Sequence, residues 1–194
     1  GGGIKDERTG AGLVEVSARV AGDLRAGRVL NGGGGLGVSG RTGPQSLDCA
    51  TLADALDDAT GRHPQYDLWM EPGRYLVAEA GVLLARVTQT KTKDAAAYVG
   101  LDTGMNSLLR PALYGAHHEI VNLSRLDEPP AMTADVVGPV CETGDVLGHD
   151  RRLPPIEPGD TLLVATTGAY GASMSNRYNL REPASEVMLA PEPA

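Results

Sequence analysis

The sequence predicts an α/β segment over residues 1–85 and an all-β segment over residues 86–194. Two observations lead to this division. Up to residue 85, apolar residues with helical spacing alternate with short strand-like runs, a pattern typical of parallel βα units. After residue 85, short β-rich runs are separated by Gly, Pro and Asp, which is typical of an antiparallel sheet.

The first segment is expected to run helix, strand, helix, strand, helix. Apolar residues three or four apart predict a helix over 12–26, and Asp48 is expected to cap a second helix that ends near residue 60. Short buried strands are expected at 28–30 and 67–70, and a last helix at 75–85. The apolar positions expected on the buried helix faces are Leu13, Val16, Val20 and Leu24, then Leu52, Ala55, Leu56 and Ala59, and finally Leu76, Ala80 and Leu83.

Two parallel strands do not make a complete parallel sheet, which needs several strands and two covered faces. The first segment is therefore interpreted as the end of a longer α/β domain. In the second segment a helix is expected to begin at Arg110, because proline is favoured in the first helical position. The strand-like runs of this segment are 82–90, 97–102, 119–123, 135–140 and 161–165.

Composition excludes several classes of function. The net charge of -8 argues against nucleic-acid binding, which usually needs a basic surface, and no apolar run approaches the length of a membrane span. Residues 1–8 lack the apolar core of a signal peptide, and Cys49 and Cys141 make neither a disulfide framework nor a zinc-ligand spacing. We expect a cytoplasmic protein without a metal, nucleic-acid or membrane partner.

The glycine-rich turn after the first strand allows three interpretations. Gly32, Gly34 and Gly37 fit the G-x-G-x-x-G pattern of dinucleotide sites, but a turn-rich stretch follows where that pattern needs a helix. The run is also compatible with a flexible connector. As a third interpretation, glycines let backbone N–H groups approach a phosphate closely, and barrel enzymes often hold phosphate at the turns after their last strands.

Charged and nucleophilic side chains lie at several other turns. Glu71-Pro-Gly-Arg74 is either a turn with a surface ion pair or a functional strand end, where a carboxylate can pair with a protonated ring nitrogen and Arg74 can bind phosphate or carboxylate. Arg110 and Tyr114 are compatible with a plain helix start. Cys141 is either an inert buried thiol or a proton donor, and Gly168-Ala-Tyr-Gly171 is compatible with a plain β-turn.

Taken in chain order, these stretches resemble the second half of the diaminopimelate decarboxylases. These are pyridoxal-phosphate (PLP) enzymes of fold type III, with an alanine-racemase-like (β/α)8 barrel. The resemblance implies that residues 1–85 form the last strands of the PLP-binding barrel and residues 86–194 the C-terminal antiparallel β-domain. The segments that carry it are Gly33-Gly-Gly-Leu-Gly37, Glu71-Pro-Gly-Arg74, Asp102-Thr-Gly-Met-Asn-Ser-Leu-Leu-Arg-Pro-Ala-Leu-Tyr114, Gly138-Pro-Val-Cys-Glu-Thr-Gly-Asp145 and Gly168-Ala-Tyr-Gly171. Segments 68–77 and 178–183 look most similar to the form fused behind an aspartate kinase in some bacteria.

The resemblance also implies a role for individual residues. Glu71 would pair with the pyridine nitrogen of PLP, and Cys141 would donate a proton after carbon dioxide leaves. Glu142 would bind the distal ammonium group of the substrate, and Arg110 with Tyr114 its distal carboxylate. The implied cofactor contacts are Gly33, Gly34, Gly35, Glu71, Gly73, Arg74 and Tyr170. The implied substrate contacts are Arg74, Arg110, Tyr114, Glu142 and Tyr170.

The function that the resemblance implies is decarboxylation of meso-2,6-diaminopimelate to L-lysine and carbon dioxide by a homodimer with shared active sites, in which Cys141 reaches the partner's site. Two alternatives stay open. None of Lys5, Lys91 and Lys93 has the buried strand context of the family's cofactor lysine, which is expected upstream of residue 1, so the chain by itself is compatible with a non-catalytic dimerisation or binding module. The other alternative is a decarboxylase of another basic amino acid, against which Glu142 weighs.

Overall fold

The structure is a computed structural model that describes residues 12, 14–19, 28–38, 47–94 and 96–190. The chain divides into two compact units, Gly1–Val77 and Ala78–Ala194. Strand β3 (Leu83–Lys93) pairs with β8 (Thr161–Val164) from Leu83 onward, so the chain has entered the second unit's sheet before residue 86. The domain boundary drawn from the sequence between residues 85 and 86 stays a prediction, whereas the compact units of the structure meet between residues 77 and 78.

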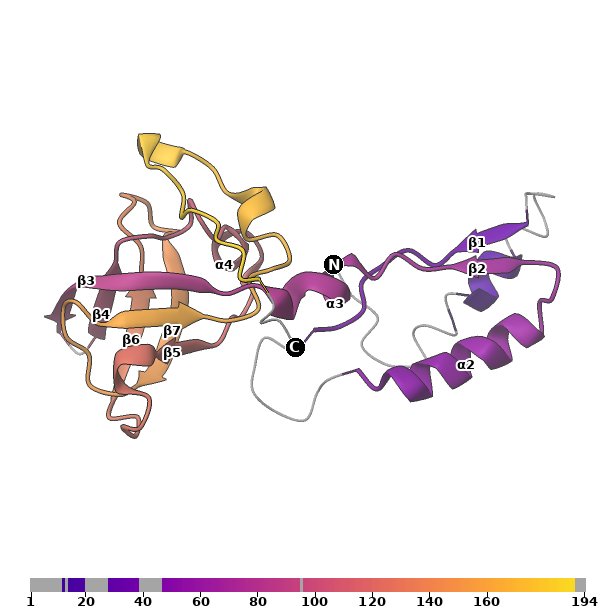
Figure 1. Cartoon of the computed structure of the whole chain (residues 1–194), viewed down its shortest axis with the longest axis horizontal. Helices are drawn as coiled ribbons and strands as arrows, with labels where there is room; N and C mark the ends of the chain where they lie inside the picture. Colours follow the sequence, from indigo (N-terminus) through magenta and orange to yellow (C-terminus); the bar gives the residue numbers. More distant parts are fainter. Residues whose placement is uncertain (1–11, 13, 20–27, 39–46, 95, 191–194) are drawn as a thin grey trace. The chain divides into compact units, whose positions relative to one another are not determined.

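The first unit contains a strand, helix, strand arrangement, as predicted (Figure 1). Strands β1 (Val29–Asn31) and β2 (Asp67–Trp69) are parallel and hydrogen-bonded, and helix α2 (Cys49–Gly61) connects them. Asp48 caps α2, because its Oδ1 accepts a hydrogen bond from the backbone N–H of Ala50 at 3.1 Å. The predicted apolar face of α2 packs against the glycine-rich turn through Leu52, which contacts Leu36 in a small core.

Two helices of the first segment differ from the prediction. Residues 14–19 are helical, but their buried side chains are Val14 and Ala18 whereas Val16 is exposed; Leu13, Val20 and Leu24 lie outside the described residues. The helix predicted at 75–85 is wrong: α3 (Gly73–Val77) and a 3-10 turn, η1 (Ala78–Ala80), precede β3.

Gly81 explains why that helix ends early. A Cβ at Gly81 would lie 2.6 Å from the Cα of Gly168, so the two backbones approach each other more closely than any side chain allows. The chain then continues into β3, whose backbone forms hydrogen bonds with β8 instead of helical hydrogen bonds. Leu76, predicted on a buried face, is 69% exposed.

The second unit is built on a six-stranded sheet in the order β5-β8-β3-β4-β6-β7. Of its five strand pairings, four are antiparallel as predicted and one, between β4 and β6, is parallel. Strand β7 was not predicted from the sequence. The remaining strands are β4 (Ala96–Leu101), β5 (Ile120–Asn122), β6 (Met132–Val137) and β7 (Val146–Leu153), and the short helical elements are α4 (Arg110–Tyr114), η2 (Leu123–Arg125), η3 (Ala172–Met174) and η4 (Tyr178–Leu180).

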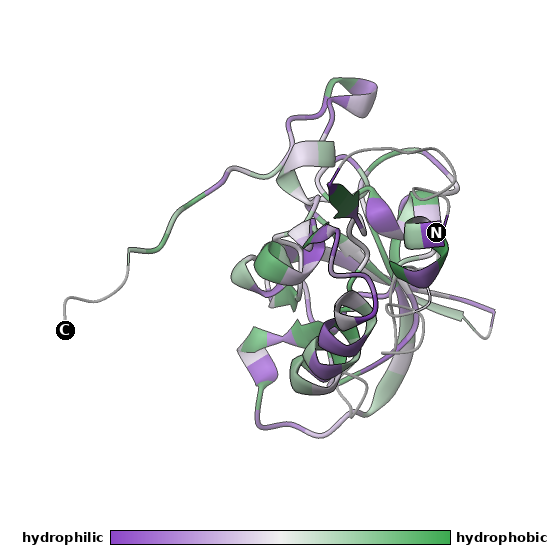
Figure 2. Cartoon of the chain, turned by 90° about the vertical axis from the view of Figure 1, so that its right-hand side faces the viewer, coloured by the Kyte–Doolittle hydropathy of each residue, from purple (hydrophilic) through white to green (hydrophobic). Residues whose placement is uncertain are grey.

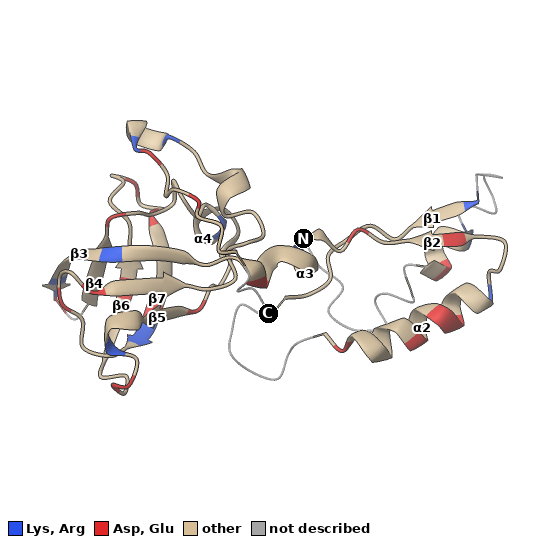
Figure 3. Ribbon diagram, viewed as in Figure 1, with Lys and Arg blue, Asp and Glu red and all other residues tan. Residues whose placement is uncertain are grey.

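One face of this sheet carries the hydrophobic core. Val99, Val136, Leu162 and Val164 are fully buried in it and come from three strands, β4, β6 and β8. In Figure 2 the helices show purple hydrophilic residues beside green hydrophobic ones, as expected of helices with one buried face. Figure 3 shows acidic residues along α2, where Asp54, Asp57 and Asp58 are exposed.

In the part of the chain that the structure describes, no helix has the length and apolar character of a membrane span.

Candidate functional site

Two turns of the first unit are joined at the carboxyl ends of the parallel strands. The backbone N–H of Glu71 donates to the carbonyl of Gly33 at 2.7 Å, so the turn after β2 is attached to the glycine turn after β1. Asn31, the last residue of β1, donates through Nδ2 to Oε1 of Glu71 and accepts through Oδ1 from the N–H of Gly33 at 2.7 Å. One asparagine therefore orients both the carboxylate and the glycine turn.

Glycine is required within this turn for two reasons. Gly33 and Gly35 have φ values of +64° and +89°, in the left-handed region that L-residues rarely adopt. A Cβ at Gly34 would overlap the carbonyl of Glu71. The turn therefore combines open glycine backbone with an oriented carboxylate. The N–H of Gly33 is already used by Asn31, so any phosphate contact falls to the Gly34 and Gly35 side of the turn.

Gly73 and Arg74 begin the short helix α3 directly after this turn. The N–H of Gly73 donates to the carbonyl of Glu71 at 2.8 Å, which closes a tight turn over Pro72. Arg74 is half-buried, whereas Glu71 is exposed. The structure thus brings together in one unit the residues predicted for the phosphate and the ring nitrogen: Gly33, Gly34, Gly35, Glu71, Gly73 and Arg74.

The predicted substrate residues lie in the second unit, at α4 and the loop 138–145. Arg110 is the first residue of α4 and Tyr114, which is 66% exposed, is its last. The loop lies beside this helix, because a Cβ at Gly144 would be 3.8 Å from the Cβ of Ala112. Arg110 and Glu142 therefore lie on two adjoining segments. This is compatible with the prediction that both residues bind the far end of one substrate.

A buried carboxylate holds the loop 138–145 in place. Asp145 is 2% exposed and accepts hydrogen bonds from the backbone N–H groups of Met105 and Val140, each at 2.6 Å. A Cβ at Gly104 or Gly138 would overlap its oxygens, so both positions need glycine. Asp145 thereby connects the loop that carries Cys141 and Glu142 to the segment that leads into α4.

Cys141 and Glu142 are both exposed at the tip of this loop. Cys141 is thus not the inert buried thiol that was one interpretation of the sequence. Oε1 of Glu142 accepts a hydrogen bond from the hydroxyl of Tyr178 at 2.8 Å, and this contact raises the pKa of the Tyr178 phenol. Tyr178 belongs to η4 and is 43% exposed. The sequence showed no role for it toward Glu142, because the two lie far apart in the chain.

Tyr170 has an unusual backbone conformation. Its φ is +75°, in a region that costs a residue with a side chain about 1–2 kcal/mol. The turn around it is fixed by a hydrogen bond from the N–H of Gly171 to the carbonyl of Thr167 at 3.0 Å. Its side chain is 41% exposed, so the role predicted for Tyr170 is compatible with the structure and stays a prediction.

His118 contacts Arg110 from the core of the second unit. The ring is fully buried, with Nε2 3.0 Å from Nη1 of Arg110 and Nδ1 2.9 Å from the carbonyl oxygen of Ala165. Burial lowers the pKa of His118 below its ordinary value, and the nearby basic groups of Arg110, His117 and Arg151 lower it further, against the opposite effect of the Ala165 carbonyl. His118 is therefore neutral at neutral pH.

This lowered pKa predicts how the stability of the second unit depends on pH. The unfolded chain, in which histidine has a pKa of about 6.5, binds more protons than the folded chain once the pH falls below that value. The stability that neutral His118 contributes to the fold is therefore fully present above about pH 6.5. As the pH falls below that value, the free energy of unfolding decreases by up to about 1.4 kcal/mol per pH unit. Urea unfolding followed by far-ultraviolet circular dichroism between about pH 7 and about pH 5 measures how steeply the free energy of unfolding changes with pH. His118→Gln should make this dependence less steep. Equal slopes for both proteins would contradict the assignment.

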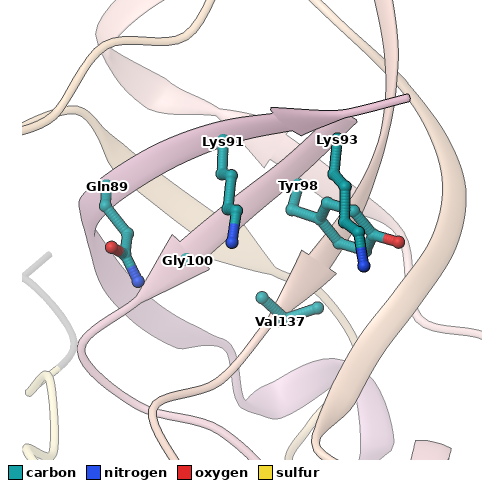
Figure 4. Close-up of a pocket in the computed structure, with 6 residues that line it drawn as sticks. All are labelled: Gln89, Lys91, Lys93, Tyr98, Gly100 and Val137. Atoms are coloured by element: carbon teal, nitrogen blue, oxygen red, sulfur yellow. The ribbon is translucent and has the colours of Figure 1, made fainter. Parts of the chain in front are cut away.

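A cavity of ≈ 290 Å³ opens on the sheet of the second unit, away from these residues. Figure 4 shows Gln89, Lys91 and Lys93 projecting from β3 toward Tyr98, Gly100 and Val137. It contains none of the predicted site residues. Among the described residues, no group of three or more His, Cys, Asp or Glu side chains is arranged to hold a metal ion.

The chain is similar to known proteins over most of its length. Residues 37–168 match the family described as pyridoxal-dependent decarboxylase, C-terminal sheet domain. The chain is 45% identical over 164 residues to the diaminopimelate decarboxylase of Vibrio cholerae and 41% identical over 164 residues to that of Archaeoglobus fulgidus, covering 84% and 81% of this chain. It superposes with a TM-score of 0.83 and 34% identity on the diaminopimelate decarboxylase of M. jannaschii solved with L-lysine, covering 94% of this chain and 44% of that one.

The predicted resemblance and fold class are confirmed by these matches. The chain spans 38% of the length of each of these two curated relatives. The family match, residues 37–168, reaches into both compact units and includes Glu71, Arg74, Arg110, Cys141 and Glu142, whereas Gly33, Gly34, Gly35 and Tyr170 lie outside it.

Proposed function

This chain belongs to the family of pyridoxal-dependent decarboxylases, and from that premise we propose that it forms part of a longer enzyme that converts meso-2,6-diaminopimelate to L-lysine and carbon dioxide. The observation that carries the proposal is the placement of Arg110 and Glu142 on adjoining segments of one unit. A cation and an anion on two adjoining segments suit a substrate whose far end bears both a carboxylate and an ammonium group. A substrate with only one of these groups would interact with only one of the two charges.

The residues at the glycine turn fit PLP chemically. Glu71 supplies a carboxylate for a protonated pyridine nitrogen, and the backbone at Gly34 and Gly35 supplies an open glycine surface for a phosphate. Arg74, directly after the turn, would bind phosphate or carboxylate oxygens. When bound, PLP serves as an electron sink for the bond that breaks at the substrate carbon. We assign Asn31 the task of holding Glu71 in the orientation that this pairing needs.

The residues of the second unit would orient the substrate and supply a proton. Arg110 and Tyr114 bind the distal carboxylate, and Glu142, held by Tyr178, binds the distal ammonium group. The thiol of Cys141 donates a proton to the carbon from which carbon dioxide has left. Its neighbour along the chain is Glu142, so the group that binds the substrate's far end and the proton donor belong to one loop.

The same proposal includes a homodimer with shared active sites in the cytoplasm, in which Cys141 acts in the partner's site. The exposure of both Cys141 and Tyr114 supports it, since each is accessible to a second copy. The lysine that attaches PLP is assigned to a part of the protein outside these 194 residues. Support comes from Lys91 and Lys93, which are exposed on β3, whereas the family's cofactor lysine is expected in a buried strand.

Glu142→Gln tests the substrate assignment. In the complete enzyme this change removes the charge opposite the distal ammonium group, so kcat/KM for meso-diaminopimelate should fall by about 10- to 100-fold, the equivalent of one charged hydrogen bond. The matched control is Glu186→Gln, the same chemical change at an exposed position. Steady-state release of carbon dioxide provides the measurement. An unchanged kcat/KM in Glu142→Gln would remove Glu142 from the substrate site.

A further inference from the structure

The guanidinium of Arg110 has a histidine as a specific neighbour. Nη1 of Arg110 lies 3.0 Å from Nε2 of His118, whose ring is fully buried, whereas Arg110 itself is half-buried. The chain is turned back to make this contact by Gly115, which ends α4 with a φ of +61° and donates its N–H to the carbonyl of Pro111 at 2.9 Å. The helix end thus places His118, in the segment that leads into β5, against the first residue of the helix.

The contacts of His118 define one protonation state. A guanidinium has only donors, so Nε2 of His118 must be the acceptor and carries no proton. The carbonyl of Ala165 has only lone pairs, so Nδ1 must be the donor. Ala165 is itself fixed, because its N–H donates to the carbonyl of Glu119 at 2.9 Å. The ring is therefore held in the neutral form with the proton on Nδ1.

We infer that His118 is a positioning residue that holds the guanidinium of Arg110 ready for the distal carboxylate of the substrate. An arginine side chain that rotates freely loses conformational entropy when it binds a carboxylate. A hydrogen-bond acceptor such as the histidine nitrogen, which fixes the guanidinium before the substrate binds, reduces that loss. This inference rests on the proposed function, in which Arg110 binds the distal carboxylate of the substrate. His118 itself does not touch the reacting atoms.

His117 offers a matched comparison within the same chain. It is adjacent in sequence and half-buried, but it contacts Arg151 and lies 3.6 Å from Glu119. Substitution of His117 should therefore leave recognition of the carboxylate unchanged, although it alters the same segment.

The test compares two ligands that differ by one carboxylate. The complete enzyme with PLP is titrated with L-lysine and with 1,5-diaminopentane, which is L-lysine without its carboxylate. His118→Asn keeps a donor for Ala165 but is too short to reach Arg110, so it should weaken binding of L-lysine by about 10- to 100-fold and leave binding of 1,5-diaminopentane unchanged. His118→Gln, which can return an acceptor to Arg110, should recover most of the loss, and His117→Gln should resemble the wild type.

A double-mutant cycle separates positioning from general stability. In the background of Arg110→Met, His118→Asn should cause no further loss of L-lysine binding, because the interaction it serves is already gone. A further loss of similar size, or an equal loss for 1,5-diaminopentane, would overturn the inference. Should His118→Asn not fold, the imidazole nitrogens of the wild-type protein give the answer by ¹⁵N NMR: a proton on Nε2 overturns the inference, and a proton on Nδ1 supports it.

The outcomes also distinguish this inference from the proposed function. A wild-type enzyme that binds L-lysine but shows no selective loss in His118→Asn contradicts the role of His118 alone. A wild-type enzyme that binds neither L-lysine nor meso-diaminopimelate contradicts the proposed function on which that role rests.

Discussion

Replacing Cys141 with alanine should lower kcat of the complete enzyme by about 10²- to 10⁴-fold, the range over which a positioned acid accelerates proton transfer. Cys141 is exposed at the tip of the loop 138–145, where a thiol can reach a substrate carbon. Alanine has no proton to give, so protonation after loss of carbon dioxide would depend on water. Because the thiol acts after the substrate is bound, KM for meso-diaminopimelate should change much less than kcat.

The control for this variant is Cys49→Ala. Cys49 is also exposed, but it begins α2 in the other unit, where its Sγ lies 2.9 Å from the hydroxyl of Tyr75. The Cys49→Ala enzyme should turn over meso-diaminopimelate at the wild-type rate. Steady-state formation of L-lysine distinguishes the two variants, and wild-type turnover by Cys141→Ala would show that the proton comes from another group.

The second large effect is expected at Asp145. Asp145→Ala leaves the N–H groups of Met105 and Val140 without their acceptors, and each unsatisfied N–H costs about 1–3 kcal/mol, so the free energy of unfolding of the second unit should fall by about 2–6 kcal/mol. Asp145→Asn has nearly the same shape but can offer only one oxygen to the two donors. Its loss of stability should therefore be smaller than that of alanine but measurable.

Two spectroscopic signals separate the two units in this experiment. The single tryptophan, Trp69, lies in β2, so its fluorescence reports on the first unit, while far-ultraviolet circular dichroism follows the sheet that dominates the second. Urea unfolding of Asp145→Ala should shift the circular dichroism transition to lower concentration and leave the Trp69 transition in place. An unchanged circular dichroism transition would mean that Asp145 does not hold the loop.

Local signals in the sequence were sufficient for part of the fold. Asp48 caps α2 through a contact two residues away, and the helix buries Leu52 and Ala59 as its periodicity predicts. The helix expected at 75–85 failed because its spacing of apolar residues competes with pairing to a distant strand and with the close approach of Gly81 to Gly168. Neither contact is visible in a local pattern.

Strand β7 was missed for a different reason. The register between β6 and β7 shifts near Ala134 and Val136, and Asp150 within β7 has a φ of +50°. These irregularities break the alternation of buried and exposed residues by which a half-buried strand is recognised, and the run His149–Arg152 is polar.

The candidate site shows the same limit. Glu71, Arg110 and Cys141 could be predicted because each carries its chemistry in its own side chain and stands in a recognisable turn. Asn31 and Tyr178 could not, because their importance lies in contacts with Glu71 and Glu142, residues far away in the sequence. A polar residue at the end of a buried strand, such as Asn31, is the one signal that could have indicated a role.

We propose that this chain supplies the substrate-binding and proton-donating residues of a diaminopimelate decarboxylase. The most direct measurement is the release of carbon dioxide and L-lysine by the complete gene product with PLP, compared for meso-diaminopimelate, ornithine and arginine at equal concentrations. We predict release from meso-diaminopimelate at the highest kcat/KM of the three. Faster release from ornithine or arginine, or none from any substrate, would contradict the account.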